Sequence, residues 1–390
     1  MTEIIPALTS RPPRYPHATS EPTLDTWQDA PHNRWAFANV SEFVATAAIP
    51  AHPRHRNGVP WLDRLVGVDD LDQRLEDAYT DALVVVRKGE LIAEYYREGF
   101  SPVDRHLLMS VSKSLCGITV GALIDDGLID PAATVAEHVP ELAGSAYGDA
   151  TVAQVMDMTV AVDYSEDYRD PDSHVRAQDR IAGWRPLHEG DPEDTYAFLS
   201  SLRASGPHGQ RFQYCSADTD VLAWIVEEVT GRRYAEVLSE RLWQRLDCAD
   251  DASVTVDAAG FPFANGGISC TARDLARVGE LMLAGGELGG RRIVSEHWVR
   301  QTLAGGDPEL ARDSAIRQTH PGASYRNQWW STGNARGNVY AVGIHGQYIW
   351  LDPPTGVVVV KMSSCPEPVT VAWNDVHSAL FRDICRSFDR

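Results

Sequence analysis

The segment from Leu107 to Gly127, LLMSVSKSLCGITVGALIDDG, sets a lysine inside an otherwise apolar run. Apolar residues recur in it at helical spacing, among them Val111 and Leu115, and Gly127 is a typical helix end. The sequence therefore predicts an apolar helix here. Lys113, one of only three lysines in 390 residues, stands in its first turn.

Ser110 precedes Lys113 by three residues, so both side chains face the same side of the predicted helix. The positive end of the helix dipole disfavours a protonated lysine, and burial adds to this effect, so the pKa of Lys113 should fall toward neutrality. A neutral lysine can accept the serine proton, and the Ser110 N–H can help to stabilise an oxyanion. The structural alternative is that Ser110 is only an N-cap and Lys113 a solvated residue.

Two further elements carry candidate chemistry. Tyr214 lies in a loop just before a helix that Ser216 opens, and a phenol near a cationic lysine should have a lowered pKa and pass a proton to a leaving amine. In Ile344-His345-Gly346, which we place on the first strand of a C-terminal hairpin, the glycine admits a substrate and a strand N–H can complete an oxyanion hole. The alternatives are a core aromatic at Tyr214 and a structural His345.

The order of elements predicts an α/β (α+β) body whose sheet is completed by the C-terminal hairpin. We expect residues 1–60 to form an irregular arm packed on the body, 61–125 and 262–390 to form the body, and 126–261 to form an inserted helical region. The elements expected within these parts are helices near 71–79, 216–230, 272–284 and 372–387, a cap at Thr151, and hairpins over 82–96 and 338–364.

Composition narrows the partners. A formal net charge of −20 without a basic block argues against nucleic acid as a partner. The N-terminus lacks the pattern of a signal peptide, and no apolar run reaches the length of a membrane span, so we expect a cytoplasmic protein. The six scattered cysteines indicate buried free thiols. The close pair His52 and His55 lies in a Pro-interrupted loop, so we expect no metal site and no cofactor.

Three motifs together carry a family resemblance: SVSK opening an apolar helix, YCS before another helix, and a late HG. They resemble the penicillin-recognising serine hydrolases, which include β-lactamases, peptidases and esterases. The surrounding sequence, for example DRHLLMSVSKSLCG and FQYCSADTDVLAWIVE, looks like the 6-aminohexanoate-dimer hydrolases over nearly the whole chain. The resemblance implies a serine β-lactamase-like fold, with an antiparallel sheet flanked by helices and an inserted, mostly helical region.

The resemblance also implies residue roles. Ser110 would be the acyl-ester nucleophile, Lys113 its base partner and Tyr214 the acid for the departing amine, with an oxyanion hole from the main chain of Ser110 and Ile344. The implied substrate is a small linear amide or ester, above all the 6-aminohexanoate dimer. The sequence leaves open whether the chain forms a homodimer. The positions implied for substrate binding are Tyr168, Asp179, Asn265, Trp330 and His345.

For Asp179 the residues suggest a reason, because a carboxylate can hold the ammonium end of a zwitterionic dimer. The alternative is a surface pair with Arg176 or Arg180. Tyr168 and Trp330 would cover the methylene chain. For Asn265 the alternative is a turn residue. The family's usual late Lys-Thr-Gly reads Ile-His-Gly here, which argues against β-lactam or cell-wall peptide turnover.

Other functional classes fit less well. A Ser-His-Asp enzyme of the α/β-hydrolase fold should carry GxSxG, which is absent from the sequence. A non-catalytic sensor with the same fold would not need Ser110, Lys113 and Tyr214 together. Within the enzyme class, a short-chain carboxylesterase is the alternative to an amidase.

Overall fold

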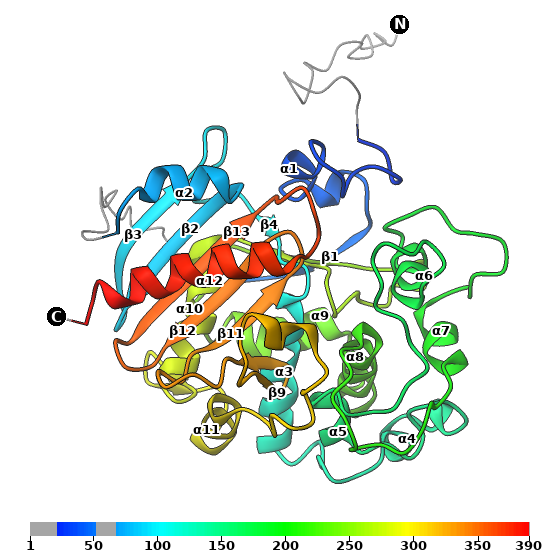
Figure 1. The fold of residues 1–390 in the computed structure, drawn as a ribbon. Coiled ribbons are helices and arrows are strands. Elements are labelled where there is room, and N and C mark those ends of the chain that lie inside the picture. The colour runs from blue at the N-terminus through cyan, green and yellow to red at the C-terminus, as the bar shows by residue number, and fades with distance from the viewer. Residues whose placement is uncertain (1–21, 52–67, 390) are drawn as a thin grey trace, which may run out of the picture.

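The computed structural model describes residues 22–51 and 68–389. Its centre is a seven-stranded sheet in which every pair of neighbours is antiparallel, in the order β3-β2-β13-β12-β11-β10-β9 (Figure 1). The first two strands form the predicted hairpin around Lys88-Gly89. The strands are β2 (Thr80–Arg87), β3 (Glu90–Tyr96), β9 (Ser324–Arg326), β10 (Trp329–Ser331), β11 (Val339–Gly343), β12 (Gln347–Asp352) and β13 (Val357–Ser363).

Strand β13 shows why this sheet lies inside the molecule. Its side chains alternate between two apolar clusters, with Val358 and Val360 in one and Val357 and Val359 in the other. Side chains of successive strand residues point to opposite faces, so a run of valines buries both faces. The central strand is therefore covered by helices on each side.

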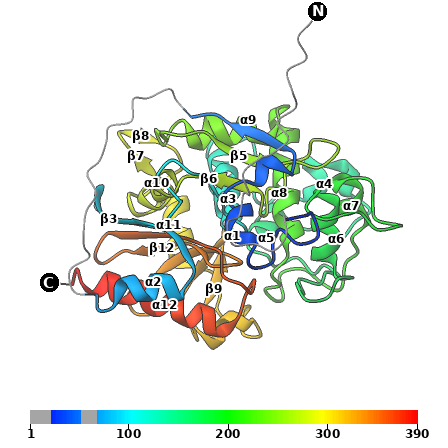
Figure 2. The same cartoon turned by 90° about the horizontal axis from the view of Figure 1, so that it is seen from above.

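Helices α10 (Ala272–Leu283) and α3 (Val111–Asp125) cover one face of the sheet, and α2 (Leu71–Asp77) and α12 (Val371–Arg386) cover the other (Figure 2). Thr271 and Thr370 cap α10 and α12 by accepting main-chain N–H groups. All four helices were expected from their apolar spacing, and the structure confirms them to within a few residues.

The helical region lies beside the sheet. The predicted cap at Thr151 is confirmed, with Gln154 completing a capping box, and α8 (Ser216–Thr230) ends at Gly231, where φ is 62°. The other helices of this part are α4 (Val135–His138), η2 (Pro140–Leu142), α5 (Val152–Met156), α6 (His174–Ile181), α7 (Thr195–Ser201), α9 (Tyr234–Leu238) and η3 (Ser239–Trp243).

Residues 22–51 are more regular than expected. They contain α1 (Asn33–Ala36), η1 (Val40–Glu42) and β1 (Thr46–Ile49), and Trp27 donates its indole N–H to the Trp184 carbonyl oxygen at 2.7 Å. Strand β1 pairs with β5, which falls inside the region expected to be helical. The division into 1–60, 61–125, 126–261 and 262–390 stays a prediction. The small sheet has the order β1-β5-β6-β4, with β4 (His106–Leu107), β5 (Ala252–Thr255) and β6 (Ile268–Cys270).

The C-terminal hairpin differs from its prediction in one way that affects the site. The stretch 338–351 was expected to be one strand, but it forms two, β11 and β12, joined by a turn at Ile344-His345-Gly346. His345 and Gly346 have φ of 63° and 91°, which a strand cannot accommodate. The remaining elements are β7 (Glu287–Leu288), β8 (Arg291–Arg292), α11 (Glu296–Ala304) and η4 (Ala315–Gln318).

Candidate active site

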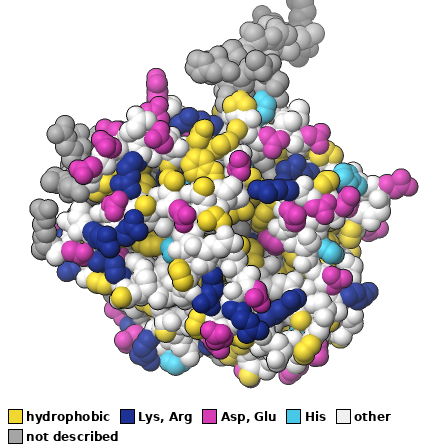
Figure 3. Space-filling view, viewed as in Figure 1, with side chains coloured by type: hydrophobic (Ala, Val, Ile, Leu, Met, Phe, Trp, Pro, Cys, Tyr) yellow, Lys and Arg dark blue, Asp and Glu magenta, His cyan; other side chains and the backbone are white. Residues whose placement is uncertain are grey.

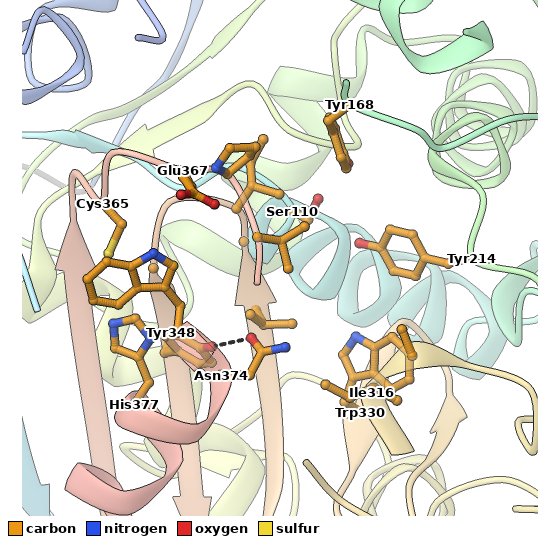
Figure 4. A pocket seen from close by; sticks show the side chains of 18 of the residues that line it. Ser110, Tyr168, Tyr214, Ile316, Trp330, Tyr348, Cys365, Glu367, Asn374 and His377 are labelled. Atoms are coloured by element: carbon orange, nitrogen blue, oxygen red, sulfur yellow. Dashed lines mark hydrogen bonds between the residues drawn. The ribbon is translucent and has the colours of Figure 1, made fainter. Parts of the chain in front are cut away.

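A cavity of about 260 Å³ lies where the start of α3, the end of β11 and the first turns of α12 come together. Figure 4 shows Ser110 in its middle, the Tyr214 hydroxyl pointing toward Ser110, and Tyr348, Glu367 and His377 on the other side of Ser110. The wall is built mainly from aromatic and aliphatic side chains, so a substrate chain placed there would lose most of its contact with water.

Ser110 occupies the N-cap position of α3, but its side chain does not cap the helix. The preceding residue, Met109, adopts φ of 49°, a conformation that residues other than glycine rarely take. Within the described chain the Ser110 side chain makes no capping hydrogen bond to α3. The structure therefore does not support the alternative of Ser110 as an ordinary side-chain N-cap. The Ser110 hydroxyl remains available to the cavity.

Lys113 places its amine against that hydroxyl. The Nζ atom lies 3.0 Å from Ser110 Oγ and 2.8 Å from the Asn265 carbonyl oxygen, and the side chain is buried. Burial lowers the pKa of Lys113 to about 8, although the carboxylates of Glu166 and Asp220 favour the charged form. A substantial fraction of the amine is neutral near this pH, which confirms the direction expected from the sequence.

Tyr214 completes a group of three. Lys113 Nζ lies 5.3 Å from the centre of the Tyr214 ring, and this ring stacks on Trp330 with centroids 5.9 Å apart. The expectation of a lowered phenol pKa was wrong. Burial raises the pKa of Tyr214, Glu166 raises it further, and only a hydrogen bond with Ser110 acts the other way. The phenol therefore keeps its proton, which suits a proton donor better than a base.

The end of β11 touches the backbone of the serine. A Cβ at Gly343 would lie 2.5 Å from the Leu108 carbonyl oxygen and 3.0 Å from the Ser110 nitrogen. Only glycine permits this approach. The contact brings Ile344, the next residue, and the Ser110 N–H to the same part of the cavity wall, where two main-chain donors could hold an oxyanion.

Of the five positions expected to bind substrate, Tyr168 and Trp330 line the cavity. The His345 side chain turns into the protein, where its Nδ1–H donates to the Cys365 carbonyl oxygen at 2.7 Å and its ring lies 5.1 Å from that of Phe37. Burial lowers the pKa of His345 to about 4. This imidazole is neutral at physiological pH and holds the turn after Ile344.

Asp179 and Asn265 lie behind the wall rather than among its described lining residues. Asp179 is buried and paired with Arg176 at 3.0 Å and Arg185 at 3.7 Å. Arg180, the other partner considered, binds Asp191 instead. The substrate-binding roles of these residues stay predictions.

Sequence reasoning missed Asp220, a buried carboxylate on α8. It accepts the Asn265 N–H at 3.0 Å, the Asn265 side-chain amide at 2.8 Å and the Gln178 amide at 2.6 Å. The Asn265 carbonyl oxygen in turn accepts a hydrogen bond from Lys113. Asp220 therefore holds Asn265 in place, and Asn265 holds the Lys113 amine. The signal in the sequence was an aspartate within the apolar stretch of a helix, which needs a partner to be buried.

Glu166 was also missed. Its carboxylate accepts the Tyr168 hydroxyl at 2.6 Å, the Ser216 N–H at 3.0 Å and the Ser216 hydroxyl at 2.6 Å. Ser216 follows Tyr214 by two residues, so Glu166 ties the 163–174 loop to the start of α8 beside the phenol. The acidic loop was visible in the sequence, but its contact with α8 was not.

Residues 22–51 and 68–389 contain no group of three His, Cys, Asp or Glu side chains arranged to hold a metal ion. His52 and His55 lie outside the described residues. The six cysteines are buried free thiols. No helix in the described ranges combines the length and the apolar character needed to cross a membrane.

Comparison with known proteins agrees with this geometry. The family model described as Beta-lactamase matches residues 68–379. A 6-aminohexanoate-dimer hydrolase of Paenarthrobacter ureafaciens is 58% identical over 384 residues, which cover 97% of each chain. A solved structure from Bacillus anthracis, provisionally assigned as a 6-aminohexanoate-dimer hydrolase, has a TM-score of 0.84 at 30% identity and covers 93% of this chain and 96% of its own. A family VIII carboxylesterase shares the fold at 16% identity, with a TM-score of 0.58 and coverage of 80% and 97%.

Proposed function

The chain belongs to the Beta-lactamase family, and on that premise we propose that it is a serine hydrolase that cleaves the amide bond of the linear 6-aminohexanoate dimer through an acyl-enzyme. This proposal depends mainly on one observation. The buried Lys113 amine lies 3.0 Å from the Ser110 hydroxyl, which does not cap α3 and lines an apolar cavity. The choice of substrate follows the name of the relative that is 58% identical.

In the proposed reaction, neutral Lys113 removes the Ser110 proton as Oγ bonds to the amide carbonyl carbon. The carbonyl oxygen becomes an oxyanion between the N–H groups of Ser110 and Ile344. Tyr214 donates its proton to the amide nitrogen, the C–N bond breaks, and the amine leaves. The Lys113 ammonium returns a proton to Tyr214, and water then hydrolyses the ester on Ser110.

We propose two kinds of substrate-binding residue, those that line the cavity and those that lie behind its wall. Tyr168 and Trp330 would cover the methylene chain from the cavity wall. Asp179 would receive the substrate ammonium, which requires one of its two arginine contacts to open. Asn265 and His345 act from behind the wall, Asn265 through its carbonyl oxygen on Lys113 and His345 through the turn after Ile344.

The test is to incubate the purified chain with the dimer and to measure release of 6-aminohexanoate, together with covalent labelling by a fluorophosphonate. We expect turnover and one label at Ser110, and loss of both in Ser110→Ala. The matched control is Ser314→Ala, a second serine lining the same cavity. Turnover that survives in Ser110→Ala would contradict the mechanism.

A short-chain carboxylesterase is the second candidate, favoured by the apolar wall and by the weaker need of esters for a leaving-group acid. A panel of short p-nitrophenyl esters run beside the dimer separates the two candidates.

We further propose that the enzyme is cytoplasmic, a compartment in which its six thiols would stay reduced. We also propose that it needs no cofactor and binds no nucleic acid. Sedimentation of the purified chain tests for a homodimer.

A further inference from the structure

The half of the cavity away from Tyr214 has no part in the proposed mechanism. Figure 4 shows Tyr348, Glu367 and His377 on this side of Ser110, and the wall continues along the first turns of α12. We call this part the α12 chamber and define it by Tyr348, Cys365, Glu367, Trp373, Asn374 and His377.

The α12 chamber contains one acidic side chain. Glu367 is an exposed carboxylate at its rim, and none of the described residues that line the cavity is a lysine or an arginine. His377 is buried, and burial together with the nearby Lys361 ammonium, 3.1 Å from its Nε2, lowers the pKa of His377 well below its usual range, so His377 itself adds no positive charge. Lys361 is buried behind His377, donates to the Ala78 carbonyl oxygen at 3.1 Å, and is not among the described lining residues. Glu166 is the other carboxylate of the lining. A carboxylate-ended chain would find no cationic partner within this wall.

The chamber wall suits an alkyl chain with a cationic end. Tyr348 is buried, and its hydroxyl is fixed by donation to Asn374 Oδ1 at 3.2 Å, so its ring is held in place. Its ring packs 5.0 Å from that of His377, and Trp373 lies 6.1 Å from His377. Aromatic faces attract ammonium groups as well as methylene groups. Figure 3 shows exposed hydrophobic side chains on the same face near the loop before α12, where Val369 is 46% exposed.

We propose that the α12 chamber is a subsite for an amine-terminated chain, so that the enzyme prefers amides whose end in this chamber is an ammonium group, such as mono-acylated α,ω-diamines, over amides whose end there is a carboxylate. This inference rests on the proposed function, since it concerns the second half of the same cavity. With the ammonium of the dimer at Asp179, its carboxylate end would lie in the α12 chamber, so the dimer should be cleaved but should be a poorer substrate than the matching amide of a diamine. It assigns Glu367 to charge recognition and the aromatic rings to the chain.

The experiment uses two sets of amides of equal length. The first set varies the amine part, as hexanoyl amides of 1,6-diaminohexane, hexylamine and 6-aminohexanoate. The second varies the acyl part, as hexylamides of 6-aminohexanoate, hexanoate and adipate. In the set whose variable end enters the chamber, we expect KM to rise in the order ammonium, methyl, carboxylate, with similar kcat. The steps should be about fivefold, the size of a partly exposed ion pair, and should shrink at high salt.

Glu367→Gln should raise KM about fivefold for the ammonium-ended member alone. The control is Asp375→Asn, because Asp375 is an exposed carboxylate on α12, eight residues after Glu367, but is not among the described lining residues. Binding of the same amides to Ser110→Ala is measured by calorimetry, so the preference can be read even without turnover.

Failure of each idea is distinct. If wild type cleaves amides but Glu367→Gln leaves the charge order in both sets unchanged, the α12 subsite is wrong and the proposed function stands. If no amide is cleaved but Ser110→Ala binds the ammonium-ended member more tightly through Glu367, the subsite stands and the amidase proposal fails. Equal binding of all members by Ser110→Ala overturns the subsite.

Discussion

On the Lys113 side of the cavity, polar groups are tied at hydrogen-bond distance to one another, whereas the α12 chamber is walled by aromatic rings and ends in an exposed carboxylate. Lys113 is held by Ser110 and by the Asn265 carbonyl oxygen, and Asn265 is held by buried Asp220. In the chamber, the Tyr348 hydroxyl donates to Asn374 and His377 contacts buried Lys361, and neither contact reaches Ser110. From this difference we infer that the Lys113 side would fix the geometry of the proposed reaction, while the α12 chamber would accept variation in the substrate.

The largest effect on activity should come from replacing Lys113, which lies at the centre of the polar side of the cavity. Lys113→Met removes the amine that in the proposed mechanism receives the Ser110 proton, and it should lower kcat/KM for amides and esters on the order of 10³-fold or more. Methionine fills the space of the alkyl chain without a buried charge. Steady-state kinetics on both substrate types check this, and wild-type rates in the variant would remove Lys113 from the mechanism.

The same variant has a stability signature. The pKa of Lys113 is about 8 in the folded chain against an ordinary value of 10.5, so the unfolded chain binds more protons between these values. The stability of wild type should therefore rise with pH from about 8 to 10.5, and this contribution should vanish in Lys113→Met. Thermal melts across that range measure it, and Lys113→Met should melt at higher temperature than wild type at pH 7.

Tyr214→Phe should separate amides from esters. An amine leaves poorly without a proton and an alkoxide leaves more easily, so we expect roughly a 100-fold loss on an amide and less than about tenfold on its ester. Phenylalanine keeps the ring that stacks on Trp330. Paired amide and ester substrates with the same acyl group give the ratio, and equal losses on both would count against Tyr214 as the leaving-group acid.

Asp220→Asn should act through Asn265. An asparagine offers one acceptor where three N–H donors now converge, and each unsatisfied buried donor costs about 1–3 kcal/mol, so kcat should fall roughly tenfold or more. Removing this negative charge also disfavours protonated Lys113. The pH at which kcat/KM rises, about 8 in wild type from the pKa of Lys113, should therefore move lower.

Asp218→Asn is the matched control for that shift. Asp218 is a buried carboxyl on the same helix that accepts the Tyr147 hydroxyl at 2.9 Å, and burial raises its pKa to about 8. At the pH near 8 where activity rises, Asp218 is therefore ionised to a smaller extent than Asp220, whose pKa burial raises only to about 7, so asparagine at 218 should move the pH profile less than asparagine at 220. An equal shift in both variants would mean that Asp220 has no specific link to Lys113.

The smallest effect belongs to the α12 chamber. Trp373→Ala removes one aromatic face from a wall with several others, so KM for chains of any charge should rise about fivefold, equivalent to about 1 kcal/mol, with kcat unchanged. Comparing neutral and cationic substrates checks this. A fall in kcat as large as that in Asp220→Asn would show that the two sides of the cavity do not differ as we infer.

What the sequence could predict depended on how local the cause was. Ser110 and Lys113 share one helix, so their contact followed from a spacing of three residues. Tyr214 stands a hundred residues away, and only family resemblance connected it to the pair. The sheet order was likewise beyond local reasoning, because β1 is four residues long and pairs with a strand about two hundred residues later.

The misses have the same origin. The pKa of Tyr214 was predicted in the wrong direction because Lys113 was the only neighbour known, while burial and Glu166 decide the outcome. The turn at His345-Gly346 looked like strand because apolar residues flank it on both sides. Buried Asp220 could not be interpreted before Asn265 and Gln178 were known to meet it.

The contact at Gly343 limits how this enzyme can be diversified. Since the strand backbone rests on the chain at Leu108 and Ser110, any side chain at 343 would push apart the two segments that carry the proposed oxyanion donors. Libraries aimed at new substrates should hold position 343 constant and vary positions 369 and 373. If position 343 is also allowed to vary, the variants that stay active should all keep glycine there, even when positions 369 and 373 have changed.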